Sequence, residues 1–137
     1  MTETTENTGN EKLNALLTQI DQLNASIFEA SHAKDYDKVR GLIDELRVVA
    51  LKLGRIGGSE AATPLVAILA EAAQAYDGSD FEEAYKLRET AFEALRQIGQ
   101  DAIPAVKKGA SDRRVAVRET CFRALKALGV KPWWQFW

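Results

Sequence analysis

The sequence contains few residues that interrupt helices or cross-link a chain. Its 137 residues include three prolines, nine glycines and one cysteine, Cys121, whereas Ala, Leu, Glu, Lys and Arg are abundant. No segment alternates between apolar and polar residues as a half-buried strand does, so a sheet is not expected. A single cysteine excludes an intrachain disulfide. With 46% apolar residues, the chain is expected to fold as one compact, all-α domain with a real core.

Long apolar runs and a secretory leader are also missing. No stretch approaches the roughly 20 consecutive apolar residues of a membrane-spanning helix. The first ten residues are polar and rich in Thr, Glu and Asn, whereas a leader is basic and then apolar. We therefore expect a cytoplasmic protein in which residues 1–10 are disordered and residues 11–131 form a single domain.

One twelve-residue segment, called the repeated phrase, occurs twice in the second half of the chain. Arg88–Gly99 and Arg118–Gly129 are identical at seven of twelve positions and lie 30 residues apart, which indicates an internal repeat. A looser copy is present at residues 51–57. Each copy has apolar residues at helical spacing and ends in a glycine suited to closing a helix. The repeating unit is therefore predicted to be helical.

Apolar periodicity and helix-breaking residues divide the chain into six predicted helices joined by short polar turns. Ser59 is expected to cap the third helix and to place Pro64 in its first turn, where a missing amide hydrogen costs little. Ser111 or Asp112 is expected to cap the sixth. Three antiparallel hairpins stacked in sequence would form an α-solenoid. The six expected ranges are 11–33, 36–56, 59–76, 79–99, 101–109 and 112–129.

The pattern of residues 47–132 resembles HEAT repeats, specifically the short HEAT-like repeats of bacterial proteins and of phycobilisome-lyase relatives. The resemblance implies an α-solenoid, with acidic and basic side chains that tie neighbouring repeats together. Such repeats serve many unrelated functions. In the last unit the matching residues are Pro104, Asp112, Val117, Arg118, Cys121, Ala124, Leu125, Leu128 and Gly129; in the preceding unit they are Pro64, Glu82, Arg88, Ala91, Ala94, Leu95, Ile98 and Gly99.

The sequence offers no constellation of catalytic or metal-binding residues. His32 is the only histidine, so neither a Cys–His pair nor a two-histidine metal site can be assembled. Cys121 aligns with Ala91 of the repeat, which indicates core packing. Residues 54–58 are rich in glycine but lack the Lys-Ser/Thr of a phosphate loop. We therefore predict a non-enzymatic protein without a metal or cofactor.

Charge is distributed unevenly along the chain. Residues 1–101 carry 10 basic and 18 acidic side chains, and residues 102–137 carry 8 and 2, so the two parts have net charges of −8 and +6. Such asymmetry is a recognised sign of an anionic partner. Arg113 and Arg114 lie at the start of a helix, where a cation opposes the helix dipole. The candidate partner-binding cations are Lys107, Lys108, Arg113, Arg114, Arg123 and Lys126.

The last six residues form a second candidate binding element. All three tryptophans of the chain lie within residues 133–137, beside a phenylalanine. Large aromatic side chains are poorly tolerated in water, so they are expected either to cap the last helical unit or to anchor a partner protein. The candidate anchors are Trp133, Trp134, Phe136 and Trp137.

These two elements predict an adaptor or scaffold subunit. Its basic, aromatic C-terminal end would meet an acidic or apolar surface of another protein, and opposite charges at its two ends also permit head-to-tail self-association. The alternative is a peripheral membrane or nucleic-acid binding module that uses the same cations. Nucleic acid is disfavoured because the pI of about 5.5 is not that of a strongly basic domain. A bilin-lyase-related accessory role is a further alternative, implied by the family resemblance.

Overall fold

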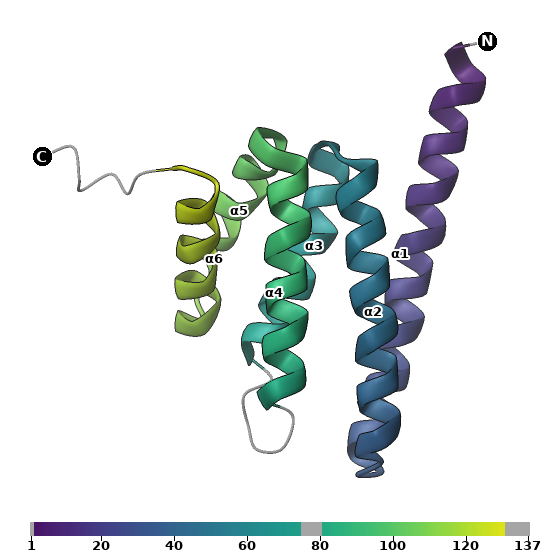
Figure 1. The fold of residues 1–137 in the computed structure, drawn as a ribbon, viewed down its shortest axis with the longest axis vertical. Helices are drawn as coiled ribbons and strands as arrows, with labels where there is room; N and C mark the ends of the chain where they lie inside the picture. Colours follow the sequence, from purple (N-terminus) through teal and green to yellow (C-terminus); the bar gives the residue numbers. More distant parts are fainter. Residues whose placement is uncertain (1, 75–80, 131–137) are drawn as a thin grey trace, which may run out of the picture.

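The computed structural model describes residues 2–74 and 81–130, and within these ranges the protein is all-α (Figure 1). The prediction of an all-α fold is confirmed. Six α-helices and one short 3-10 helix follow each other without a strand in the described ranges. They are α1 (Thr2–His32), α2 (Tyr36–Ile56), α3 (Gly58–Gln74), α4 (Phe81–Ile98), η1 (Gly99–Ala102), α5 (Ile103–Gly109) and α6 (Val115–Ala127).

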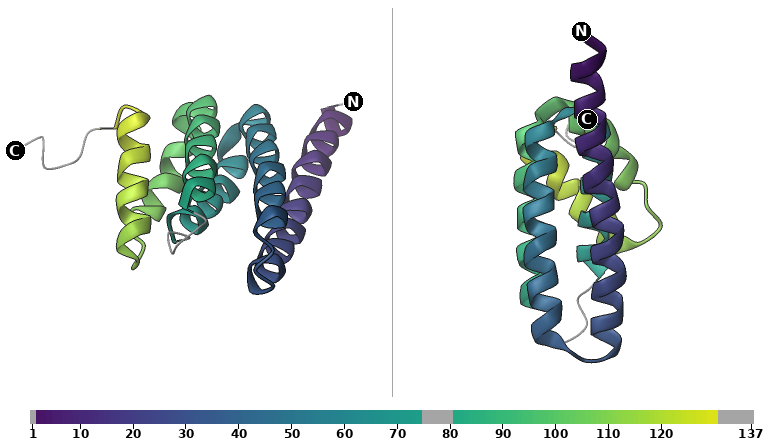
Figure 2. Two further views of the ribbon diagram at one scale, coloured as in Figure 1. Left: turned by 60° about the horizontal axis from the view of Figure 1, so that its bottom comes forward. Right: turned by 90° about the vertical axis from the view of Figure 1, so that its right-hand side faces the viewer.

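The helices are arranged in two layers. Helices α2, α4 and α6 lie side by side in one layer, where α4 contacts both α2 and α6 (Figure 1). Helices α1, α3 and α5 lie behind them, and each packs against the helix that follows it in the chain. The views of Figure 2 show α1 and α6 at opposite ends of the row. The two ends of the molecule are therefore built from different parts of the sequence.

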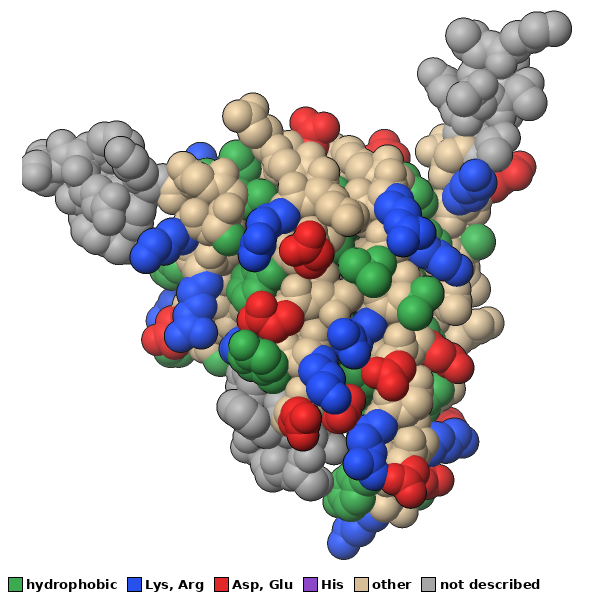
Figure 3. Space-filling model, in the orientation of Figure 1, with side chains coloured by type: hydrophobic (Ala, Val, Ile, Leu, Met, Phe, Trp, Pro, Cys, Tyr) green, Lys and Arg blue, Asp and Glu red, His purple; other side chains and the backbone are tan. Residues whose placement is uncertain are grey.

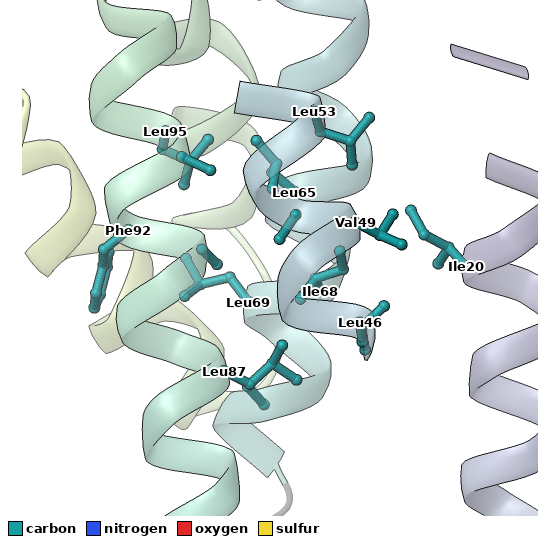
Figure 4. Close-up of a cluster of buried hydrophobic side chains, with 14 of the residues drawn as sticks. Ile20, Leu46, Val49, Leu53, Leu65, Ile68, Leu69, Leu87, Phe92 and Leu95 are labelled. Carbon is teal, nitrogen blue, oxygen red and sulfur yellow. The ribbon is translucent and has the colours of Figure 1, made fainter. Parts of the chain in front are cut away.

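Apolar side chains from both layers form one continuous core. Figure 4 shows Leu46, Val49 and Leu53 of α2, with Leu65 and Leu69 of α3, in this interior. The largest fully buried side chains are leucines and valines. Burying each of them stabilises the fold by about 1.5–3 kcal/mol. The side chains that form this core are the apolar residues whose helical spacing predicts the helices.

Helix α2 has the ends that its flanking residues predict. Asp35 is its N-cap and accepts a hydrogen bond from the Lys38 amide at 3.3 Å. At the other end Gly57 has a φ of 76°, and its amide donates to the Leu53 carbonyl at 3.1 Å. A positive φ is inexpensive for glycine because it has no Cβ.

Two helix starts differ from the predicted ones. Helix α1 begins at Thr2, within the segment expected to be disordered. Extending an existing helix fixes one residue for each hydrogen bond gained, whereas starting a new one fixes several, so a polar leader can continue a helix that the core stabilises. Helix α3 begins at Gly58, so Ser59 lies inside it and does not cap it.

The predicted position of Pro64 is also wrong. Pro64 is the seventh residue of α3 and lies in the helix interior, beyond the first turn. There it lacks the amide that would bond to the carbonyl of Glu60, four residues earlier. The neighbouring residues Leu65 and Ala61 are fully buried. Packing against the core therefore outweighs the local cost of the proline.

The repeated phrase has the same environment in α4 and α6. The threonines, the small residues and the leucines that correspond in the two helices are all buried. Gly99 and Gly129, which end the two copies, have φ values of 77° and 84°. Thr90 and Thr120 each donate to the carbonyl four residues earlier, at 2.9 and 2.7 Å. The corresponding buried pairs are Leu87 and Val117, Thr90 and Thr120, Ala91 and Cys121, Ala94 and Ala124, and Leu95 and Leu125.

Candidate binding surface at the last hairpin

The turn between α5 and α6 is held by a bidentate ion pair. Arg114 donates to both carboxylate oxygens of Asp112, from Nε at 2.9 Å and from Nη2 at 3.0 Å. Its backbone amide donates to the same carboxylate at 2.9 Å. These hydrogen bonds from Arg114 lower the pKa of Asp112 to about 2. The carboxylate is therefore fixed as an anion beside the start of α6.

The cap of α6 differs from the predicted one. The N-cap is Arg114, which makes no side-chain capping hydrogen bond, whereas Ser111 or Asp112 was expected there. Asp112 instead accepts the amide two residues later, as aspartate does in an Asx turn, and this moves the helix start to Val115. Arg114 does lie at the start of α6, as predicted, and the Asp112 carboxylate beside it offsets the unfavourable interaction of its charge with the helix dipole.

Arg118, near the start of α6, also stabilises the α5–α6 connection. Its Nη1 donates to the backbone carbonyls of Asp112 and Arg113, at 3.3 and 3.2 Å. The family resemblance implies that Asp112 and Arg118 link neighbouring repeats, but these contacts lie within one hairpin. A contact between hairpins is made elsewhere, where Arg47 of α2 donates to the Thr90 hydroxyl of α4 at 2.9 Å.

The remaining candidate cations lie on the surface of the last hairpin. All of them are exposed, and none forms an ion pair with another described residue. Several basic side chains of α2 and α4 pair with an acidic residue of their own helix, as Arg47 does with Asp44 and Arg96 with Glu93. Lys38, Lys52 and Arg55 of α2, however, are exposed and have no ion pair within the described ranges, like the candidate cations. The candidate cations that are exposed and have no ion pair with a described residue are Lys107, Lys108, Arg113, Arg123 and Lys126.

The structure divides these cations into two groups. Lys107 and Lys108 lie in the last turn of α5, and Arg113 follows them in the α5–α6 turn. Arg123 and Lys126 lie farther along α6, at about 12 and 16 Å from Val115 for a rise of 1.5 Å per residue. The candidate cations therefore form two groups on one hairpin: a turn group, Lys107, Lys108 and Arg113, and a helix group, Arg123 and Lys126.

The face of the molecule formed by α2 and α4 has mixed charge. Figure 3 shows Lys and Arg side chains interspersed with Asp and Glu over α2 and α4. Residues 102–130 contain seven basic and two acidic side chains, and one of the two acids, Asp112, is engaged by Arg114. An anionic partner would therefore meet the strongest excess of positive charge at the α5–α6 hairpin.

The other chemical groups singled out by the sequence lie in structural environments. Cys121 is fully buried, and burial raises the pKa of its thiol to about 11. His32 is exposed, and its ring lies 4.5 Å from that of Phe28, one helical turn earlier. Within the described ranges no three His, Cys, Asp or Glu side chains are placed to hold a metal ion. The described helices also include none that is long and apolar enough to span a membrane.

The aromatic candidates Trp133, Trp134, Phe136 and Trp137 lie outside the described residues. The chain matches no protein-family model, no curated protein and no solved structure.

Proposed function

We propose that the protein is a non-enzymatic adaptor that binds an acidic surface of another protein through its α5–α6 hairpin. The observation that carries this proposal is the excess of positive charge on this hairpin, since residues 102–130 carry seven basic and two acidic side chains. Exposed cations in clusters attract an anionic partner and raise its association rate. Lys107, Lys108 and Arg113 would form one contact group, and Arg123 and Lys126 the other.

The rigidity of the α5–α6 turn supports the same proposal. The bidentate Asp112–Arg114 pair and the two carbonyl contacts of Arg118 fix the backbone from which Arg113 projects. A preorganised surface loses less conformational entropy on binding than a mobile loop does. In this proposal Asp112, Arg114 and Arg118 position the surface, and the exposed cations contact the partner.

The aromatic residues would supply the apolar part of the interface. Trp133, Trp134, Phe136 and Trp137 follow the basic hairpin directly in the sequence. Tryptophan and arginine are the residues most enriched among interface hot spots, so the two elements would complement each other. We further propose that the stacked helical pairs form a HEAT-like α-solenoid, in which the α6 end serves as the contact surface.

Site-specific photo-crosslinking tests the proposal. A photoreactive amino acid replaces Lys108 or Arg123, and in the control it replaces Lys52, an exposed cation of α2. We expect a discrete protein adduct from positions 108 and 123 in an extract of the producing cells, and none from position 52. Equal adducts from all three positions would contradict the proposal.

The same measurement separates the protein-binding proposal from its alternative. Adducts to nucleic acid or lipid at positions 108 and 123 would favour a nucleic-acid or membrane-surface module. Nuclease digestion shortens a nucleic-acid adduct, and intact-mass measurement identifies a lipid adduct by a mass increase far smaller than that of a protein. A nuclease-resistant adduct with the added mass of a protein is the result expected for a protein partner.

A further inference from the structure

Two phenylalanines at the same position of the repeat differ in exposure. Phe92 of α4 is 9% exposed and Phe122 of α6 is 43% exposed, although the surrounding positions of the two helices are equally buried. Phe92 lies on the side of α4 that faces α6 (Figure 4). Helix α6 is the end of its layer in the described structure (Figure 1), so Phe122 occupies the side on which a further element would pack.

A second apolar side chain lies on the same face of α6. Val115 is 56% exposed and precedes Phe122 by seven residues, which is two helical turns. The two side chains therefore lie on one face of α6 about 10 Å apart, with the charged residues Arg118 and Glu119 at the helix positions between them, and this face is called the Val115–Phe122 strip. Phe28, the most exposed large apolar residue at the opposite end of the molecule, has Asn24, Ser31 and His32 one helical turn away on α1, and its ring lies 4.5 Å from that of His32. The strip is thus a feature of the α6 end.

The chain leaves α6 in a way that can bring the following residues back to this strip. The Val130 amide donates to the Leu125 carbonyl at 2.9 Å, and Gly129 has a φ of 84°, as in a helix-closing Schellman turn. After the equivalent Gly99, the 3-10 helix η1 contacts both α3 and α4, so the chain changes direction at this glycine.

The spacing of the aromatic residues matches the strip. Phe122 lies about 9 Å along the helix from Leu128, and Val115 lies about 20 Å from it, at 1.5 Å per residue. An extended chain spans at most about 3.3–3.6 Å per residue. Trp133 and Trp134 can therefore reach Phe122, and Phe136 and Trp137 can reach Val115.

We propose that residues 131–137 dock on the Val115–Phe122 strip of α6 within the same molecule. The docked segment would occupy the place that α6 occupies beside Phe92. Its outward aromatic side chains would lie next to Arg123 and Lys126. This proposal goes beyond the adaptor function and does not depend on the cations that carry that function; it leaves to a partner only those aromatic side chains that face away from the strip.

A second copy of the chain is a less suitable occupant of the strip. Pairing of two α6 helices would bring Arg123 and Lys126 of one copy close to the same cations of the other, and like charges repel. Contact with the α1 end would place Phe122 against a helix whose exposed residues are mainly polar, such as Asn14, Thr18 and Asp21, with Phe28 as the one strongly exposed large apolar side chain among its described residues. A head-to-tail contact between copies would depend on concentration, so dilution distinguishes it from docking within one molecule.

Tryptophan fluorescence tests the docking, because all three tryptophans lie in the proposed segment. The full chain is compared with a synthetic peptide of residues 129–137, and acrylamide is the quencher because it is neutral and is not attracted by the cations. We expect emission at shorter wavelength and weaker quenching in the full chain than in the peptide, unchanged on dilution. Phe122→Ser should lose this shielding.

Phe28→Ser is the matched control, since it removes an exposed phenylalanine at the other end of the molecule and should leave the shielding intact. Far-UV circular dichroism verifies that each variant is folded. If Phe122→Ser does not fold, Val115→Ser tests the same strip. Quenching of the full chain equal to that of the peptide would overturn the proposal. Shielding that survives both strip substitutions, or that disappears on dilution, would overturn it as well.

Discussion

Arg47 of α2 donates from Nε to the hydroxyl of Thr90 on α4 at 2.9 Å, which joins two helices that are 43 residues apart in the sequence. The same hydroxyl donates to the Lys86 carbonyl within α4, also at 2.9 Å. Thr90 is buried, so both of its hydrogen-bonding functions are satisfied at a position with little access to water. The contact fixes the register between the first and second helical pairs.

Thr90→Val should therefore destabilise the protein more than Thr120→Val. Both substitutions remove a hydrogen bond from the threonine hydroxyl to a carbonyl of its own helix. Only Thr90→Val also removes the acceptor of Arg47, and a hydrogen bond to a charged group contributes about 1.5–3 kcal/mol. Urea unfolding followed by circular dichroism measures the difference between the two variants. Equal losses would show that the Arg47 contact contributes nothing to stability.

Gly54→Ala is expected to destabilise the protein, although alanine is normally preferred in a helix. A Cβ at Gly54 would lie 2.9 Å from the Ala94 Cα and 3.0 Å from its Cβ, so α2 and α4 would have to move apart. Overpacking of this kind costs about 1–3 kcal/mol. Thermal or urea unfolding measures the effect.

Gly41→Ala is the matched control on the same helix. A Cβ at Gly41 meets nothing within 4 Å, so only the helix preference of alanine remains. We expect a gain of about 0.5–1 kcal/mol. A decrease in the free energy of unfolding for Gly54→Ala together with an increase for Gly41→Ala would support the close α2–α4 contact. An increase for both substitutions would contradict it.

The thiol of Cys121 should be unreactive in the folded protein. It is fully buried, and burial raises its pKa to about 11, so the reactive thiolate is scarce at neutral pH. We expect negligible reaction with a thiol reagent such as dithionitrobenzoate in buffer and full reaction in denaturant. Rapid labelling of the folded protein would contradict the buried position of Cys121.

The Asp112–Arg114 pair predicts a specific acid sensitivity. The pKa of Asp112 is lowered from 3.8 to about 2 in the folded protein, so this carboxylate favours folding above pH 3.8. Its contribution is lost as the pH falls from 3.8 to about 2, because protonation then removes the ion pair. The measurement is the difference in unfolding free energy between the wild type and Asp112→Asn. That difference should shrink across this pH range.

Asp21→Asn is the control for this titration. Asp21 is exposed on α1, and its carboxylate accepts no hydrogen bond from another described residue. The substitution should have little effect on the free energy of unfolding. If the loss of unfolding free energy caused by Asp112→Asn does not change with pH, the charge of Asp112 does not contribute to stability.

The helices follow from the sequence because their periodicity is strong and their turns contain specific stop residues. Gly57, Gly99 and Gly129 end helices as the repeat predicts, and the small residues at positions 91 and 121 are buried. The residue types at Ser59 and Pro64 did not predict the start of α3 correctly. There the buried side chains of α3 determine where the helix begins, and they do so through contacts with residues distant in the sequence.

The candidate site is only partly visible in the sequence. Charge asymmetry identifies the last hairpin, but it does not show that Arg114 is held by Asp112 while Arg113 is not. That distinction depends on backbone geometry in a five-residue turn. The difference between Phe92 and Phe122 is likewise invisible in the repeat, because identical residues acquire different environments only when the helices are placed side by side.

A comparison of two charge variants tests the adaptor proposal most directly. Lys107→Gln, Lys108→Gln and Arg113→Gln remove three exposed cations from the last hairpin, and Lys38→Gln, Lys52→Gln and Arg55→Gln remove three from α2. Both variants have the same net charge, so a general charge effect would act on them equally. Quantitative mass spectrometry measures the proteins that each variant retains from an extract of the producing cells. We predict that the first variant loses the protein captured by the wild type and that the second retains it; equal retention by both would contradict the account.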